Sequence, residues 1–126
     1  MRPSTTYVAL VGAVVARLRR QANLQQAELG QRMGVNQSSW SKIERGETAM
    51  SVEYLALLKP VLHIEPHEVL AAADRVVAYA EGQGVQVFVQ RTELSAEAMQ
   101  GQLSGRALVA LVEAGLAEQA GLKDGR

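Results

Sequence analysis

Five polar residues near the middle of the chain share one face of a predicted helix and have the chemistry to contact nucleic acid. Their side chains are amides, hydroxyls and cations without a carboxylate, whereas an ordinary solvated face mixes both charge signs. Amides and hydroxyls match the hydrogen-bonding edges of bases, and cations match phosphate oxygens. Periodicity alone leaves an ordinary solvated face as an equal alternative. The five residues are Gln37, Ser38, Ser41, Lys42 and Arg45.

Two short helices joined by a tight turn are expected to position this face. The first is predicted over residues 26–33 and ends at Gly34, the residue type best suited to a left-handed helix cap. Asn36 is a good N-cap for the second helix, which is expected to stop at Gly46. Trp40 falls on the apolar side of this helix, so we expect it in the core.

The rest of the chain is predicted to be mostly helical, with one exception after Gly84. Apolar residues recur at helical spacing in each predicted segment, and Ser, Thr, Pro or Gly marks the ends. Proline is expected to end the helix that Ser51 caps. The further helices are expected over residues 5–22, 51–60, 66–80, 95–102 and 104–119.

Residues 85–90 alternate with a period of two, which predicts a single β-strand. No second convincing strand is evident, and a lone strand cannot satisfy its own backbone groups. The simplest partner is the same strand of another copy, paired antiparallel about a two-fold axis. Residues 1–82 are therefore expected to form one domain, and residues 83–126 a strand-plus-helix oligomerisation module. The residues expected at this contact are Val85, Val87, Phe88, Val89, Leu108, Leu111 and Val112.

The overall charge of zero hides two halves of opposite sign. Residues 1–46 carry seven basic and two acidic side chains, a net charge of +5, and residues 47–126 carry six and eleven, a net charge of −5. A polyanionic partner is therefore expected for the first part only. The chain has no cysteine, which excludes disulfides and thiolate metal sites and is compatible with a reducing cytoplasm, where we expect the protein.

Residues 8–75 resemble the phage-repressor-like helix-turn-helix domain, also called the XRE or Cro/C1-type family. The resemblance implies a mostly α fold, a five-helix lambda-repressor-like DNA-binding domain whose third helix enters the DNA major groove. Residues 83–126 resemble no family that we can name. The residues that carry the resemblance are Leu18, Gln26, Glu28, Leu29, Gly34, Gln37, Ser38, Ser41, Lys42, Ile43, Glu44, Gly46, Ser51 and Leu55.

The resemblance also implies roles for individual DNA-binding residues. Gln26 would anchor to a backbone phosphate and brace the recognition helix. Gln37 and Ser38 would read bases with Asn36 beside them, and Lys42 would contact a guanine edge or a phosphate. Ser41 and Arg45 complete the expected contact face.

A structural ion pair is implied between Arg19, late in the first helix, and Glu44, late in the third. We expect it to be partly buried and to orient the recognition helix, which makes Glu44 structural and not a catalytic acid. The sequence departs from the family pattern at Trp40, where isoleucine or valine is usual, and at Gly30, where alanine is usual. The loop over residues 47–50 also lacks the basic residues that relatives often carry, so each domain is expected to bind DNA modestly.

These patterns together predict a sequence-specific DNA-binding transcriptional regulator, which binds a palindromic operator as a homodimer or a dimer of dimers. The alternative is an antitoxin-like regulator that neutralises a protein partner through residues 83–126. An enzyme is not expected, because no catalytic constellation is evident. No cofactor or metal is expected either, since Pro66 separates His63 from His67. A ligand-sensing regulator has little room for a dedicated pocket after Gly84.

Overall fold

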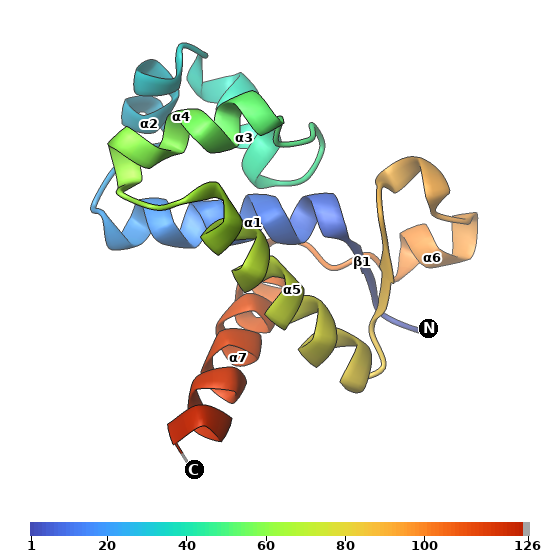
Figure 1. Ribbon diagram of the computed structural model, residues 1–126. Coiled ribbons are helices and arrows are strands. Elements are labelled where there is room, and N and C mark those ends of the chain that lie inside the picture. Colours follow the sequence, from blue (N-terminus) through green and yellow to red (C-terminus); the bar gives the residue numbers. More distant parts are fainter. Residues whose placement is uncertain (125–126) are drawn as a thin grey trace.

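A computed structural model describes the backbone of residues 1–124 and the side chains of residues 1–118 (Figure 1). Helices dominate the fold, and two short strands lie far apart in sequence. The elements are β1 (Ser4–Thr6), α1 (Tyr7–Gln21), α2 (Gln26–Met33), α3 (Gln37–Glu44), α4 (Val52–Leu62), α5 (Pro66–Gly82), β2 (Gln86–Phe88), the 3-10 turn η1 (Arg91–Glu93), α6 (Ala96–Gln100) and α7 (Gly105–Asp124).

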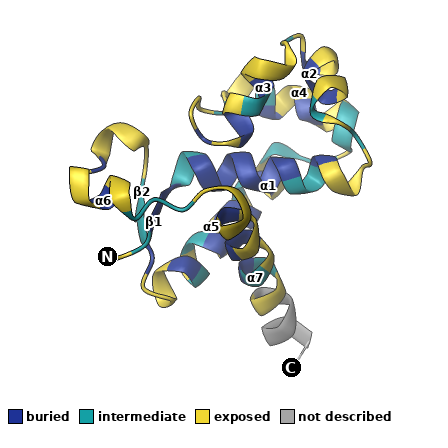
Figure 2. Ribbon diagram, turned by 180° about the vertical axis from the view of Figure 1, so that it is seen from behind, coloured by how far each residue is buried: buried dark blue, intermediate teal, exposed yellow. Residues whose placement is uncertain are grey.

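Helix α1 runs through the middle of the molecule, with α2, α3 and α4 on one side and α5 and α7 on the other (Figures 1 and 2). Its apolar residues are buried around most of its circumference, and Leu10, Val14 and Val15 are at most 2% exposed. A helix that is apolar on nearly all sides must be covered on nearly all sides. The core is therefore built around α1. Among the described helices, none is long and apolar enough to cross a membrane.

Side-chain caps explain where several helices begin. The prediction that the first helix begins at residue 5 is wrong. Thr6 accepts a hydrogen bond from the backbone N–H of Ala9 at 3.0 Å, so α1 begins at Tyr7. Ser51 caps α4 in the same way, and Pro66 occupies the first position of α5, where a missing N–H costs nothing.

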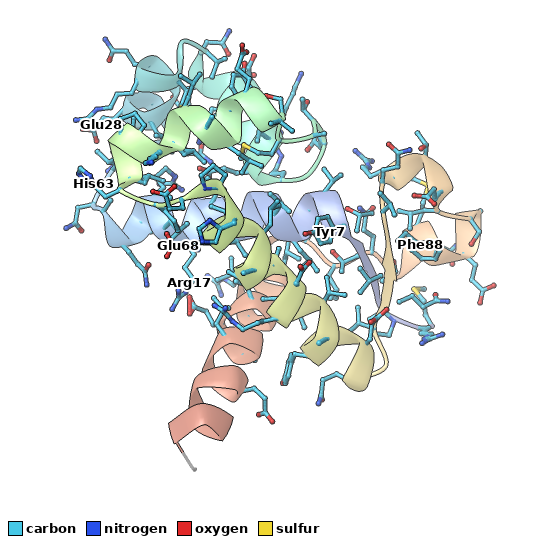
Figure 3. The ribbon with its side chains drawn as sticks, in the orientation of Figure 1. Tyr7, Arg17, Glu28, His63, Glu68 and Phe88 are labelled. Atoms are coloured by element: carbon cyan, nitrogen blue, oxygen red, sulfur yellow. The ribbon has the colours of Figure 1, made fainter. Side chains whose placement is uncertain are left out.

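The sequence predicted that the fourth helix ends at Pro60, but α4 continues to Leu62. Pro60 lies in the last turn, where its missing N–H removes only one hydrogen bond of the helix. The helix ends instead at His63, whose φ of 54° is left-handed and whose N–H donates to the carbonyl of Lys59 at 2.8 Å. His63 is exposed between α4 and α5 (Figure 3), and no three described His, Asp or Glu side chains gather as metal ligands.

The prediction that the C-terminal strand lacks a partner within its own chain is wrong. Strand β2 pairs in parallel with β1 at the N-terminus, with Ser4 opposite Gln86 and Thr6 opposite Phe88. Strand β1 escaped prediction because its three residues, Ser-Thr-Thr, are polar and show no apolar alternation, although all three are 0% exposed. The parallel pairing also needs a long crossover, which the whole helical domain supplies.

The other edge of β1 is covered by residues 101–103. The N–H of Ser4 donates to the carbonyl of Gly101, the N–H of Leu103 donates to the carbonyl of Ser4, and both distances are 2.8 Å. The Ser4 hydroxyl donates to the carbonyl of Ala98 at 2.6 Å. Strand β1 is thus held on both edges, whereas β2 has one neighbouring strand in the described chain.

Helix α7 packs on α5 and α1 of its own chain. Gly115 allows a close approach, because a Cβ atom there would lie 3.2 Å from the Cα of Val76. Arg17 of α1 points toward α7 (Figure 3), and its Nε donates to Glu113 at 2.8 Å. Four residues expected at a contact between copies are therefore buried inside the chain and are not free for that role: Val85, Leu108, Leu111 and Val112.

Candidate nucleic-acid interface

Helices α2 and α3 meet through the turn that the sequence predicted at Gly34. This glycine has a φ of 78°, and its N–H closes α2 on the carbonyl of Gln31 at 3.1 Å. The side chain of Asn36 then accepts from the N–H of Ser39 at 2.8 Å and caps α3. The cap leaves the first N–H groups of α3 pointing outward, which suits an approaching phosphate.

The residues predicted to contact DNA lie on the open side of α3. Asn36, Gln37, Ser38, Lys42 and Arg45 are all exposed, and Ser41 is partly exposed. Trp40, Ile43 and Glu44 form the opposite, buried side of the same helix. The structure therefore brings the predicted reading residues together on one accessible surface.

Glu44 is the centre of a buried hydrogen-bond network that holds α1, α2 and α3 together. Its side chain is 4% exposed and pairs with Arg19, whose Nε lies 2.7 Å from Oε2 and whose Nη2 lies 3.1 Å from Oε1. Arg19 also donates to the carbonyl of Leu24 at 2.8 Å. The ion pair thus ties the end of α1 to both the loop before α2 and the last turn of α3.

Two further donors complete the shell of Glu44. Gln26 donates from Nε2 to Oε1 at 2.9 Å, and Trp40 donates from its indole Nε1 to Oε2 at 2.7 Å. Gln26 therefore lies against the buried end of α3 and not on its outer face, and it is partly exposed. The Trp40 contact could not be foreseen from the family pattern, because isoleucine or valine has no N–H to offer.

Two glycines let α3 pack closely despite its large tryptophan. A Cβ atom on Gly12 of α1 would lie 2.3 Å from the carbonyl oxygen of Ile43, and one on Gly30 of α2 would lie 3.0 Å from that of Val35. Trp40 is 0% exposed and meets Tyr54 of α4 edge to face, with ring centroids 6.3 Å apart. The absence of these two side chains therefore makes room for the tryptophan in the core.

Arg45 is exposed but already has a partner at the end of α3. Its Nε donates to Glu47 at 2.6 Å, and its Nη1 donates to the hydroxyl of Ser41. The hydrogen bond from Arg45 lowers the pKa of Glu47, and the positive charges of Arg91 and Lys42 lower it further. One carboxylate therefore neutralises part of the positive surface beside the reading face.

Sequence reasoning did not single out Arg91, which belongs to η1 of the acidic half of the chain. The pairing of β1 with β2 brings this segment back beside the end of α3, close enough to influence Glu47. No motif surrounds Arg91 in the sequence, so only the fold could reveal this position.

A family model described as a helix-turn-helix domain matches residues 10–77, which is more than half of the chain. The chain therefore belongs to this helix-turn-helix family, in agreement with the XRE-like pattern of its sequence, and its domain is of the kind found in DNA-binding regulators. No curated protein and no solved structure matches the chain.

Proposed function

We propose that this protein is a transcriptional regulator that binds operator DNA by inserting α3 into the major groove. One observation carries the proposal. The polar residues Gln37, Ser38 and Lys42 lie exposed on one side of α3. On the buried side of the same helix, the hydrogen bonds to Glu44 hold α3 against its neighbours. A rigidly held helix with an accessible, acid-free face is what base recognition requires.

The residues divide into two kinds of contact. Gln37 can present a paired donor and acceptor to adenine, and Ser38 is beside it at the start of α3. Lys42 lies one turn later and would hold a guanine edge or a phosphate. Gln26 has one amide hydrogen in the Glu44 network and keeps its second amide hydrogen to donate to a backbone phosphate.

Selection of binding sites from random duplexes, followed by measurement of affinity, tests this assignment. Gln37→Ala is expected to cost about 1–3 kcal/mol on the selected operator and to relax specificity at one base pair. Gln31→Ala is the matched control, since Gln31 is an equally exposed glutamine on α2 outside the proposed face. If both variants bind as the unchanged protein does, the assignment of the reading face is wrong.

Lys42→Ala tests the second kind of contact. If Lys42 holds a phosphate, the variant should bind all sequences more weakly and lower the salt dependence of log K by about 1. Lys59→Ala is its control, because Lys59 pairs with Glu65 at 3.0 Å, away from α3. An unchanged salt slope with unchanged specificity would remove Lys42 from the interface.

We also propose that the protein binds a palindromic operator as a homodimer or a dimer of dimers. Two recognition helices would then meet major grooves about 34 Å apart. With β1 covered on both edges, the outer edge of β2 is the strand edge left for an antiparallel pairing between copies. Val87 and Phe88 belong to this strand, and Val89 beside it is 61% exposed.

The mass of the full chain in solution, free and on DNA, tests this contact. A chain ending at Glu81 is not a clean test, because it would uncover the faces of α1 and α5 that α7 buries. Val89→Lys should shift the dimer to monomer by placing a charge at the edge in both copies. A full chain that stays monomeric in both conditions would contradict the homodimer.

The antitoxin-like alternative is not favoured. It was suggested by a strand without a partner and by the acidic surface of residues 83–126. Strand β2 has a partner in β1, and Arg91 from this segment lies near the C-terminal end of α3 and contributes positive charge there.

A further inference from the structure

The helix-turn-helix domain and the C-terminal segment line a cavity of about 390 Å³ that is open to solvent on one side. Its walls come from the last turns of α1, the start of α2, the end of α3 with the loop after it, η1, and residues 99–109. This volume lies within the range of small-molecule sites. The sequence indicated too little room for a pocket after Gly84, but the cavity forms because both parts of the chain contribute to it.

The charged wall of the cavity has an excess of arginine. Arg19 and Arg45 are paired with the carboxylates of Glu44 and Glu47. Arg20 and Arg91 also line the cavity, and both are exposed. Neither forms an ion pair with a described carboxylate.

Two positive charges therefore remain on the lining, and they come from different elements. Arg20 comes from α1 and Arg91 comes from η1. An anionic group on Arg91 would gain charge-assisted hydrogen bonds without displacing an existing ion pair.

Part of the lining is apolar. Ala13 and Ala16 of α1 and Leu108 of α7 are buried. Met99 and Val109 also line the cavity and are 47% and 39% exposed. Methionine at such a surface can adapt its shape to a ligand.

We propose that this cavity binds a small amphipathic carboxylate, with the carboxylate on Arg91 and the apolar body against Met99 and Val109. A free phosphate or acetate would leave the apolar wall open, and an uncharged apolar molecule would leave the arginines unsatisfied. The combination of the two walls selects a ligand that has both parts.

Such a ligand would weaken DNA binding, a consequence that rests on the proposed function. Gln26 and Arg45 line the cavity and also belong to the proposed DNA contacts. A carboxylate on Arg91 would add negative charge near Arg45 and Glu47 and so oppose the approach of a DNA phosphate to this surface. By linkage, DNA would weaken ligand binding by the same factor.

Titration of the full chain with sodium octanoate, without DNA, tests the site directly. Trp40 is the only tryptophan, so its indole N–H gives a single resonance. Glu44 accepts from this N–H and also lines the cavity, so octanoate should shift the resonance in a saturable way. 1-Octanol, which lacks the charge, and acetate, which lacks the body, should each bind at least roughly tenfold more weakly.

Two exposed variants place the ligand within the cavity. Arg91→Gln should weaken octanoate binding roughly tenfold by removing a charge-assisted hydrogen bond. Met99→Glu should weaken it at least as much by placing a negative charge on the lining. Arg75→Gln is the matched control, because Arg75 is exposed on α5 outside this cavity, and it should bind octanoate as the unchanged protein does.

Failure of the cavity and failure of the DNA function give different results. No saturable octanoate binding, or equal binding by the unchanged protein and Arg91→Gln, overturns the cavity proposal. That proposal is also overturned if Arg91→Gln lowers DNA affinity while octanoate does not bind, since the arginines then serve DNA phosphates. If the unchanged protein does not bind DNA in the absence of octanoate, the proposed function is wrong. The octanoate titration, which uses no DNA, tests the cavity separately.

Discussion

Replacing Glu44 by glutamine is expected to destabilise the protein strongly, although the two side chains have nearly the same shape. Both carboxylate oxygens of Glu44 accept two hydrogen bonds, from Arg19 and Gln26 on one oxygen and from Arg19 and Trp40 on the other. An amide puts an NH₂ group in place of one oxygen, where it faces two donors. Arg19, 9% exposed, is left as a buried cation without its counter-charge.

Removal of one member of a buried ion pair costs about 3–5 kcal/mol, compared with under about 1 kcal/mol for an exposed pair. The side chains of Arg19 and Glu44 are 11% and 4% exposed, so the larger range applies. An unfolding entropy of about 2.1 cal/mol/K per residue over 126 residues converts 1 kcal/mol to roughly 4 °C. The melting temperature of Glu44→Gln should therefore fall by roughly 10–20 °C.

Urea denaturation followed by circular dichroism measures this loss without relying on Trp40, whose emission the substitution itself would change. Glu113→Gln is the matched control, because Glu113 pairs with Arg17 at 2.8 Å but is 49% exposed. Its cost should stay below about 1 kcal/mol. Equal losses for the two variants would refute the reasoning, since burial of the Glu44 pair would then contribute nothing.

Three further substitutions are expected to change stability or affinity in defined directions. Gly12→Ala should destabilise by about 1–3 kcal/mol in urea denaturation, because its Cβ atom would lie 2.3 Å from the carbonyl oxygen of Ile43 and force α1 away from α3. Thr5→Val should stabilise by about 1 kcal/mol in the same assay, because the buried hydroxyl of Thr5 has no hydrogen-bond partner among the described residues. Glu47→Gln should raise affinity in DNA titrations by freeing Arg45 for phosphate.

Controls within the chain separate these effects from general ones. Gly82→Ala, at the end of α5, meets no atom within 4 Å and should not destabilise as Gly12→Ala does. Ser4→Ala removes a hydroxyl that does have a partner, the carbonyl of Ala98, and should destabilise where Thr5→Val stabilises. Equal DNA affinity for Glu47→Gln and the unchanged protein would show that the Arg45 pair does not restrain binding.

The elements around the reading face were predictable because their signals are local. A capping side chain acts within three residues, a left-handed glycine acts at its own position, and helical periodicity needs only two or three turns. Asn36 and Gly34 therefore marked the ends of α2 and α3 from the sequence alone, and the structure has both where predicted. The buried position of Glu44 was implied by the family resemblance and not by helical register.

Strand β1 and its pairing were not predictable in this way. Ser4 and Thr5 look like solvent-exposed polar residues, and only contacts with residues about 80 to 100 positions later bury them. Pairing over such separations depends on the assembled core, which no local pattern encodes. Because β1 was not predicted, β2 was wrongly expected to have no partner strand within its own chain.

The sequence by itself determined the helix-turn-helix and its acid-free face, because both depend on residue type at short spacing. The ion pair between Arg19 and Glu44, 25 residues apart, was implied only by the resemblance to the family. The tertiary structure alone decided what lies next to that face. It placed Arg91, from the acidic half of the chain, near the C-terminal end of α3. It also formed a cavity between two parts of the chain. Both outcomes follow from the docking of β2 on β1 and of α7 on α1 and α5, which requires the complete core.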